Sequence, residues 1–220
     1  MFSRVSTRSA AAFCAVALLV GCSAPTQLSV GNAAAGLFFK VPSTWTKIDK
    51  RLVDAAQKGW TTSESGAAIL KSTLWFEIWT ESDSIDVNAA LSNSVVDSPV
   101  VIATVRNLLE IEKKNLGNDI KIALQDLVVP VSTAVEGDGL EISSNDRFAF
   151  SGYEGIQQLL SWDVDGSTQT FRVLALIDAD QNHLYLVVAR CSDICFSENQ
   201  NAIDSIIKSI ALKEPINANL

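Results

Sequence analysis

His183 is the single histidine of the sequence and therefore the first candidate for acid–base or nucleophilic chemistry. It lies in or beside a predicted turn over residues 178–182, between two predicted strands. A histidine base needs a group that orients its ring and a nucleophile that it can activate. The neighbouring sequence offers neither, so we predict that His183 is an exposed turn residue and assign no catalytic residue.

Two short motifs resemble functional sites by their letters alone. Asp178–Asn182 imitates the first half of a calcium loop, but His183 replaces the required glycine and Ala189 the bidentate glutamate. Ser205 and Lys208 match an S-x-x-K pattern, but both fall on the polar face of a predicted helix and no Lys-Thr-Gly segment exists.

One histidine and two clustered cysteines are too few ligands for structural zinc. We therefore expect no metal and no cofactor.

Cys22 ends the sequence Leu-Val-Gly-Cys, which looks like the lipobox of bacterial lipoproteins. Before it, Arg4 and Arg8 precede an apolar run over residues 10–20, which has the length of a signal-peptide core and is too short to span a bilayer. We predict a signal peptide over residues 1–21 and lipidation of Cys22, which would anchor the protein on the extracytoplasmic face of the cell membrane. Two acyl chains would make this attachment stable. The alternative is an ordinary secretory signal with a chance cysteine.

Two cysteines, Cys191 and Cys195, remain once Cys14 leaves with the signal and Cys22 carries lipid. Cysteines this close in an oxidising exterior are most simply joined by a local disulfide. The alternative is a pair of free buried thiols. A redox-active pair is disfavoured, because the spacing is C-x-x-x-C and Arg190 is the only nearby cation that would lower a thiol pKa.

Trp75 and Trp79 share one face of a predicted strand over residues 73–80, with Glu77 between them. The opposite face of this strand is already apolar. Either a helix covers the tryptophan face, or Trp75, Glu77 and Trp79 form a binding surface for a ligand or partner.

The composition is acidic and rich in apolar residues, with 48% hydrophobic residues and a formal net charge of −8. This charge disfavours nucleic acid and anionic headgroups as partners. Residues 22–36 are small and polar and predict a flexible tether. Residues 37–220 are long enough for one domain with a substantial core.

Hydrophobic periodicity predicts an α+β domain with a central antiparallel sheet sandwiched between helices. We expect a short helix over residues 48–59, and a long helix from Ser98 to about Leu116, with Pro99 at its first position. The last helix begins near Ser197, and Gln200 completes its capping box. The expected strands span residues 37–41, 73–80, 120–124, 127–135, 156–164, 170–177 and 184–190, with a turn at 137–139.

Three segments resemble the PsbP-like α/β/α sandwich, a fold shared by Mog-type Ran-binding proteins and LpqN-type actinobacterial lipoproteins. They are Phe39–Trp45, the three-strand meander within Ile156–Ala189, and the closing helix Asn201–Ser209. The resemblance implies this fold and, since the fold hosts mostly binding and assembly roles, a non-enzymatic function.

The expected function is a membrane-anchored binding or accessory module of the cell envelope, which holds a protein partner or an apolar envelope molecule. A lipid or glycolipid carrier is an alternative, and it requires an internal cavity of several hundred Å³. A carboxylate-based envelope hydrolase is the other alternative.

Overall fold

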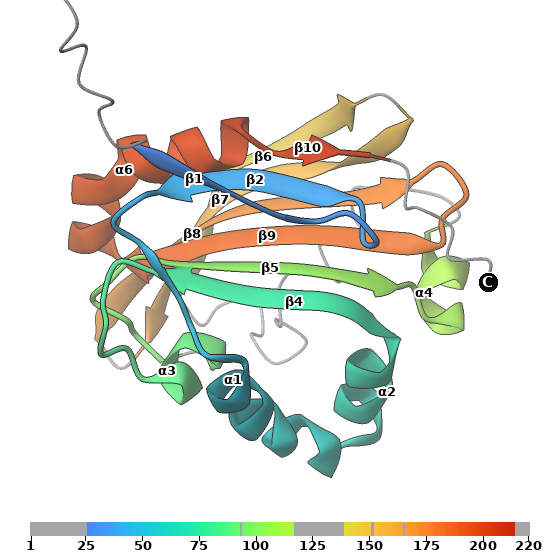
Figure 1. Ribbon diagram of the computed structural model, residues 1–220, viewed down its shortest axis with the longest axis horizontal. Helices are drawn as coiled ribbons and strands as arrows, with labels where there is room; N and C mark the ends of the chain where they lie inside the picture. The colour runs from blue at the N-terminus through green and yellow to red at the C-terminus, as the bar shows by residue number, and fades with distance from the viewer. Residues whose placement is uncertain (1–25, 93, 117–138, 151, 165, 214–220) are drawn as a thin grey trace, which may run out of the picture.

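The structure is a computed structural model that describes residues 26–92, 94–116, 139–150, 152–164 and 166–213. Within these ranges a large antiparallel sheet has the strand order β3-β4-β5-β9-β8-β7-β6, and a small sheet has the order β1-β2-β10. The small sheet and helix α6 lie against one face of the large sheet, and α1, α2 and α3 lie beside its β4 edge (Figure 1).

The elements follow the chain in this order: β1 (Gln27–Asn32), β2 (Leu37–Pro42), β3 (Thr46–Lys47), α1 (Lys50–Gln57), the 3₁₀ helix η1 (Lys58–Thr62), α2 (Glu64–Ser72), β4 (Thr73–Thr80), α3 (Val87–Leu91), β5 (Val100–Asn107), α4 (Glu110–Asn115), β6 (Leu140–Phe150), β7 (Tyr153–Val164), β8 (Ser167–Asp178), β9 (His183–Ser192), α6 (Asp193–Lys208) and β10 (Ala211–Leu212).

The large sheet separates two hydrophobic clusters, because side chains alternate along each strand. In β9, Tyr185, Val187 and Ala189 join the larger cluster, under the small sheet and α6, while Leu184 joins the smaller cluster on the opposite face. Strands that are buried on both faces lose the polar alternation of a half-exposed strand. The almost wholly apolar sequences of β8 and β9 therefore reflect their central place, and the predicted antiparallel meander is confirmed.

The prediction of a long helix from Ser98 to Leu116 was wrong. Residues Val100–Asn107 form strand β5, which pairs with β4 and β9 in the middle of the sheet, and only Glu110–Asn115 is α-helical. The segment over residues 100–105 is rich in β-branched residues, which favour a pleated, buried surface. The spacing of its apolar residues suits a helix as well as a strand buried on both faces, so the local pattern does not distinguish the two, and pairing with β4 and β9 makes this segment a strand.

The folded region also begins earlier than predicted. Gln27–Asn32, expected within the flexible tether, form β1 and pair in antiparallel register with β2. The first strand is exposed along much of its length, and only Val30 is buried. Its hydrophobic pattern was therefore too weak to reveal a strand, and the hairpin with β2 is what orders it.

Of the other sequence expectations, some are confirmed, one is wrong and some lie outside the described residues. The strand over residues 73–80 is confirmed as β4, and the first short helix as α1. The last helix begins at Asp193 rather than near Ser197, so the predicted capping box is not its N-terminus. The strands expected at 120–124 and 127–135 and most of the turn at 137–139 lie outside the described residues.

Among the described helices, none combines the length and apolar character that a bilayer crossing requires.

Candidate binding pocket

A pocket of about 290 Å³ lies between helix α6 and the β6-β7-β8 side of the large sheet. Its lining residues come from three strands of that sheet, from α6, from Ile210 after α6 and from β10. They are Phe148, Gln157, Arg172, Leu174, Leu176, Asp204, Ile207, Lys208, Ile210 and Leu212. We call this the α6 pocket.

The charged lining residues of the α6 pocket are Arg172, Asp204 and Lys208. Arg172 Nε lies 3.9 Å from Asp204 Oδ1, which is an ion pair but too long for a hydrogen bond. This Nε atom is buried and has no hydrogen-bond acceptor within the described part of the chain. Lys208 follows Asp204 by one helical turn and is exposed.

The apolar lining continues from this charged group along both walls. On β8, Leu174 and Leu176 share a face with Arg172, since residues two apart in a strand point the same way. On the other wall, Ile210 and Leu212 follow Lys208 along the chain. The pocket therefore offers an apolar surface beside charged side chains. This arrangement suits a ligand that carries an apolar part next to a charged or polar part.

Sequence reasoning missed this pocket, because its apolar residues resemble ordinary core. One signal was available: Arg172 interrupts the otherwise apolar sequence Phe-Arg-Val-Leu-Ala-Leu-Ile of β8. An arginine in a strand that is covered on both faces requires a partner or a solvent-connected space.

The structure places the predicted binding face, Trp75, Glu77 and Trp79, in two different environments. Trp75 is 8% exposed and packs against Phe39 of β2, with 6.3 Å between the ring centroids. Trp79 is half-buried, and its indole Nε1 donates a hydrogen bond of 3.1 Å to Glu77 Oε2. Glu77 also forms an ion pair with Lys47 of β3. Trp75 therefore belongs to the core, and only the Glu77–Trp79 end is accessible to a partner.

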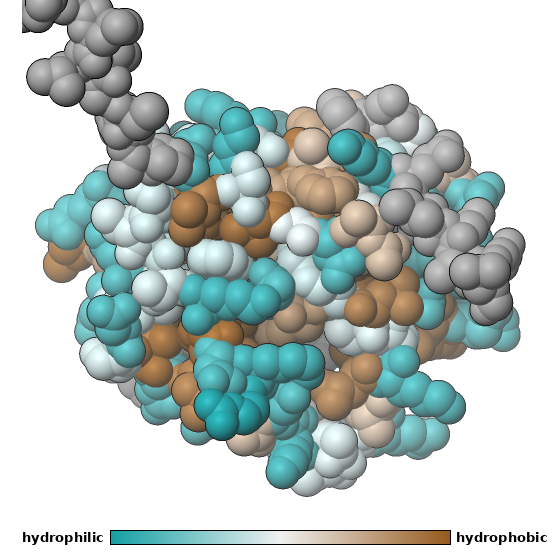
Figure 2. All heavy atoms as spheres, viewed as in Figure 1, coloured by the Kyte–Doolittle hydropathy of each residue, from teal (hydrophilic) through white to brown (hydrophobic). Residues whose placement is uncertain are grey.

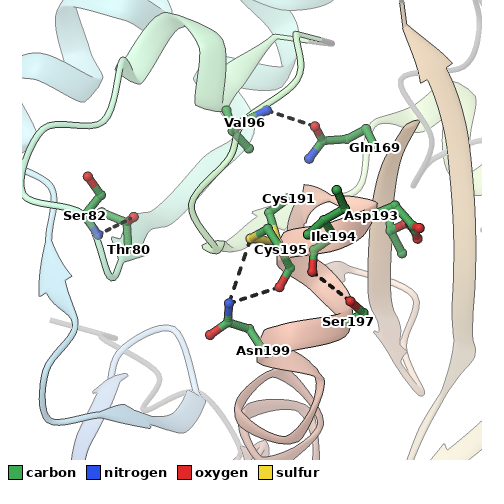
Figure 3. The surroundings of a disulfide bond; sticks show 11 residues. Thr80, Ser82, Val96, Gln169, Cys191, Asp193, Ile194, Cys195, Ser197 and Asn199 are labelled. Atoms are coloured by element: carbon green, nitrogen blue, oxygen red, sulfur yellow. Dashed lines mark hydrogen bonds between the residues drawn. A yellow bond between two sulfur atoms is a disulfide. The ribbon is translucent and has the colours of Figure 1, made fainter. Parts of the chain in front are cut away.

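Cys191 and Cys195 are joined by a disulfide, with 5.9 Å between their Cα atoms (Figure 3). The bridge connects the end of β9 to the first turn of α6, where the Asn199 side-chain amide donates to the Cys195 carbonyl at 3.0 Å. Both cysteines are buried. The bridge therefore anchors the N-terminal end of the helix whose C-terminal half forms a wall of the α6 pocket.

His183 lies beside the β8–β9 turn as predicted, but it is not fully exposed, and the expectation that no neighbouring group orients its ring was wrong, because Asp178 contacts it. The His183 side chain is 24% exposed, and Nδ1 lies 2.5 Å from Asp178 Oδ2. The other oxygen of Asp178 accepts the backbone N–H groups of Asn182 and His183, at 2.7 and 3.0 Å. Asp178 thus orders the β8–β9 turn, as aspartates commonly do in turns. The ring of Tyr185 lies 6.3 Å from that of His183, and burial raises the pKa of the Tyr185 hydroxyl.

Arg190 connects the segment after α3 to the large sheet. Its guanidinium is buried and donates to the carbonyls of Ser92 and Ser94, while Phe171 lies under it at 5.2 Å. Burial lowers the pKa of Arg190 to about 10, so the group remains charged at neutral pH. The Gln169 side chain supports the same segment by accepting the Val96 N–H at 2.9 Å (Figure 3).

The view in Figure 2 shows apolar side chains in small separate patches between hydrophilic ones, without one large apolar area on this face. Isolated patches of this kind are normal on a protein surface. Across the described ranges, no three His, Cys, Asp or Glu side chains are grouped closely enough to hold a metal ion.

Comparison with known proteins identifies the fold. No protein-family model and no curated protein matches the sequence. Among solved structures, LpqN of Mycobacterium tuberculosis, described as involved in cell envelope biogenesis, aligns with a TM-score of 0.50 and 13% identity over 85% of this chain and 90% of LpqN. Cyanobacterial PsbP (CyanoP) of Synechocystis sp. PCC 6803 aligns with a TM-score of 0.51 and 11% identity over 90% of this chain and 99% of CyanoP.

The Ran-binding protein Mog1p of Saccharomyces cerevisiae aligns with a TM-score of 0.49 and 8% identity over 84% of this chain and 95% of Mog1p. The alignments with LpqN and CyanoP show that the chain has the PsbP-like α+β fold that the sequence resemblance predicted. At these identities the likeness concerns the fold and does not extend to activity.

Proposed function

We propose that the protein is a lipid-anchored, non-enzymatic binding or accessory module of the cell envelope, and that it binds through the α6 pocket. The observation that carries this proposal is the pocket itself, in which six apolar side chains adjoin the Arg172–Asp204 pair. Concave apolar surfaces with a few convergent polar groups are the usual form of a binding site.

The proposed location rests on the lipobox-like sequence before Cys22 and the apolar run over residues 10–20. The fold of LpqN, a protein of cell envelope biogenesis, is compatible with an envelope role. A protein tethered by lipid acts near the membrane, where it can present its pocket to other envelope components.

The α6 pocket has the size of a small binding site. Pockets for small molecules typically span about 300–1,000 Å³. At about 290 Å³, the α6 pocket lies at the lower end of this range, so a side chain or a short part of a larger molecule would fill it.

Lipidation is tested by metabolic labelling with an alkyne-modified palmitate in a bacterium that matures lipoproteins. The wild-type protein should incorporate the label and sediment with membranes, whereas the Cys22→Ala variant should do neither. Equal labelling and fractionation of the two proteins would refute the anchor.

Binding is tested in the lipidated protein with a benzophenone amino acid introduced in place of Ile210, which lines the pocket. The matched control carries the same group in place of Asn201, an exposed residue of α6. Illumination of intact cells should yield a discrete adduct from position 210 and none from position 201. The absence of an adduct at position 210, or the same adducts at both positions, would contradict binding through this pocket.

A further inference from the structure

We propose that the α6 pocket recognises a protein segment that presents an acidic side chain beside an apolar one, and that Arg172 binds the acid. This inference rests on the proposed function and specifies the partner of the same pocket.

The first argument is the incomplete pairing of Arg172. Its Nε atom is buried without a hydrogen-bond acceptor in the described part of the chain, and Asp204 stands 3.9 Å away. A hydrogen bond from arginine to a carboxylate spans about 2.7–2.9 Å. The Arg172 side chain as a whole is 21% exposed, so a carboxylate brought by a partner can approach its accessible part and form the close pair that Asp204 does not form.

The second argument is the local charge. The protein carries a formal net charge of −8, yet among the described residues the pocket lining has two cationic side chains, Arg172 and Lys208, and one acidic side chain, Asp204. The pocket is thus a cationic site on an acidic molecule. Charge complementarity at such a site selects acidic groups and disfavours basic ones.

The third argument is the spacing of charge and apolar surface. Arg172 and Leu174 lie two residues apart on the same face of β8, about 7 Å along the strand. A ligand that uses both must carry its acid and its apolar group at a comparable separation. Neighbouring side chains of a protein segment satisfy this requirement, since residues on one face of a strand repeat at the same interval.

The remaining lining favours a peptide over an acyl chain. Gln157 contributes a carboxamide, which can both donate to and accept from a peptide group. An acyl chain offers no partner for this amide, and burying the amide unpaired against a hydrocarbon is unfavourable.

The test selects a display library of random linear peptides against the purified protein in its oxidised form. Enriched peptides should contain an aspartate or glutamate close to a large apolar residue. The Arg172→Gln variant should bind the enriched peptides roughly tenfold or more weakly, as expected for loss of a hydrogen bond to a charged group. The charge-reversed Arg172→Glu variant should instead enrich peptides with lysine or arginine, which a merely structural role of Arg172 would not produce.

The matched control is Arg147→Gln, since Arg147 is exposed and its register partner Ile156 belongs to the cluster on the opposite face. It should leave peptide affinity unchanged, and thermal melts should show that all three variants are folded. Enriched peptides without an acid, or with equal affinity for Arg172→Gln, would overturn the role of Arg172.

A second probe separates this inference from the proposed function. The Ile210→Asp variant places a charge in the apolar part of the pocket and should abolish peptide binding. If peptides bind wild-type protein but not Ile210→Asp, and their affinity does not change in the Arg172 variants, then the pocket binds peptides but Arg172 does not recognise an acidic side chain. If no peptide is enriched and the fluorescent fatty acid cis-parinaric acid binds in an Ile210-dependent manner, the pocket binds an apolar molecule and the peptide inference is overturned. Binding of neither probe would overturn both.

Discussion

Truncation of Trp75 is the sharpest test of how the two sheets pack. In the structure Trp75 is 8% exposed and contacts Phe39, which itself is 2% exposed in the small sheet. Trp75→Ala should therefore remove a large buried side chain from the interface between the sheets and leave a cavity. Truncation of a buried tryptophan costs about 3–5 kcal/mol. For a domain of this size, that loss corresponds to a decrease in Tm of about 6–20 °C.

The matched control for this change is Leu74→Ala, because Leu74 is adjacent in β4 but 51% exposed. This substitution should change the free energy of unfolding by only about 0.5 kcal/mol. Urea unfolding followed by circular dichroism gives both free energies, and thermal melts give the Tm values. If Trp75→Ala is no more destabilising than Leu74→Ala, then Trp75 is not core and the packing of the small sheet described here is wrong.

The other predictions concern the bridge, the last helix and one carboxylate. Replacing both cysteines of the Cys191–Cys195 bridge with serine should lower stability by about 2 kcal/mol, measured by urea unfolding, and two alkylatable thiols in unreduced wild-type protein would exclude the bridge. Ile206→Asp, which buries an unpaired charge at a residue 1% exposed, should cost more than about 3 kcal/mol in the same assay, whereas Asn201→Asp on the exposed side should be nearly silent. Hydrogen bonds from Arg51 hold the pKa of Asp49 at about 2, below its usual 3.8. The stabilising contribution of this carboxylate is therefore present above pH 3.8 and lost as the pH falls through 2. NMR of the Asp49 carboxyl group should show a titration midpoint at about 2, and Arg51→Gln should raise that midpoint.

The sequence alone determined those parts of the fold whose local pattern has one interpretation. The alternation over residues 73–80 predicted β4, and the isoleucine spacing of the last helix predicted which side is buried, as Ile203, Ile206 and Ile207 confirm. Chain proximity and an expected oxidising environment were enough to predict the disulfide. Each of these inferences depends only on residues that are near one another in the chain.

Only the tertiary structure decided the identity of β5 and the place of β1. Val100–Asn107 is a strand because β4 and β9 pair with it on both sides, and Gln27–Asn32 is ordered by its hairpin with β2. The α6 pocket has the same origin, since Arg172 and Asp204 are distant in the chain and meet only when α6 packs on the sheet. Local composition sets the preferences of a segment, but long-range pairing determines which preference is realised and which side chains share a surface.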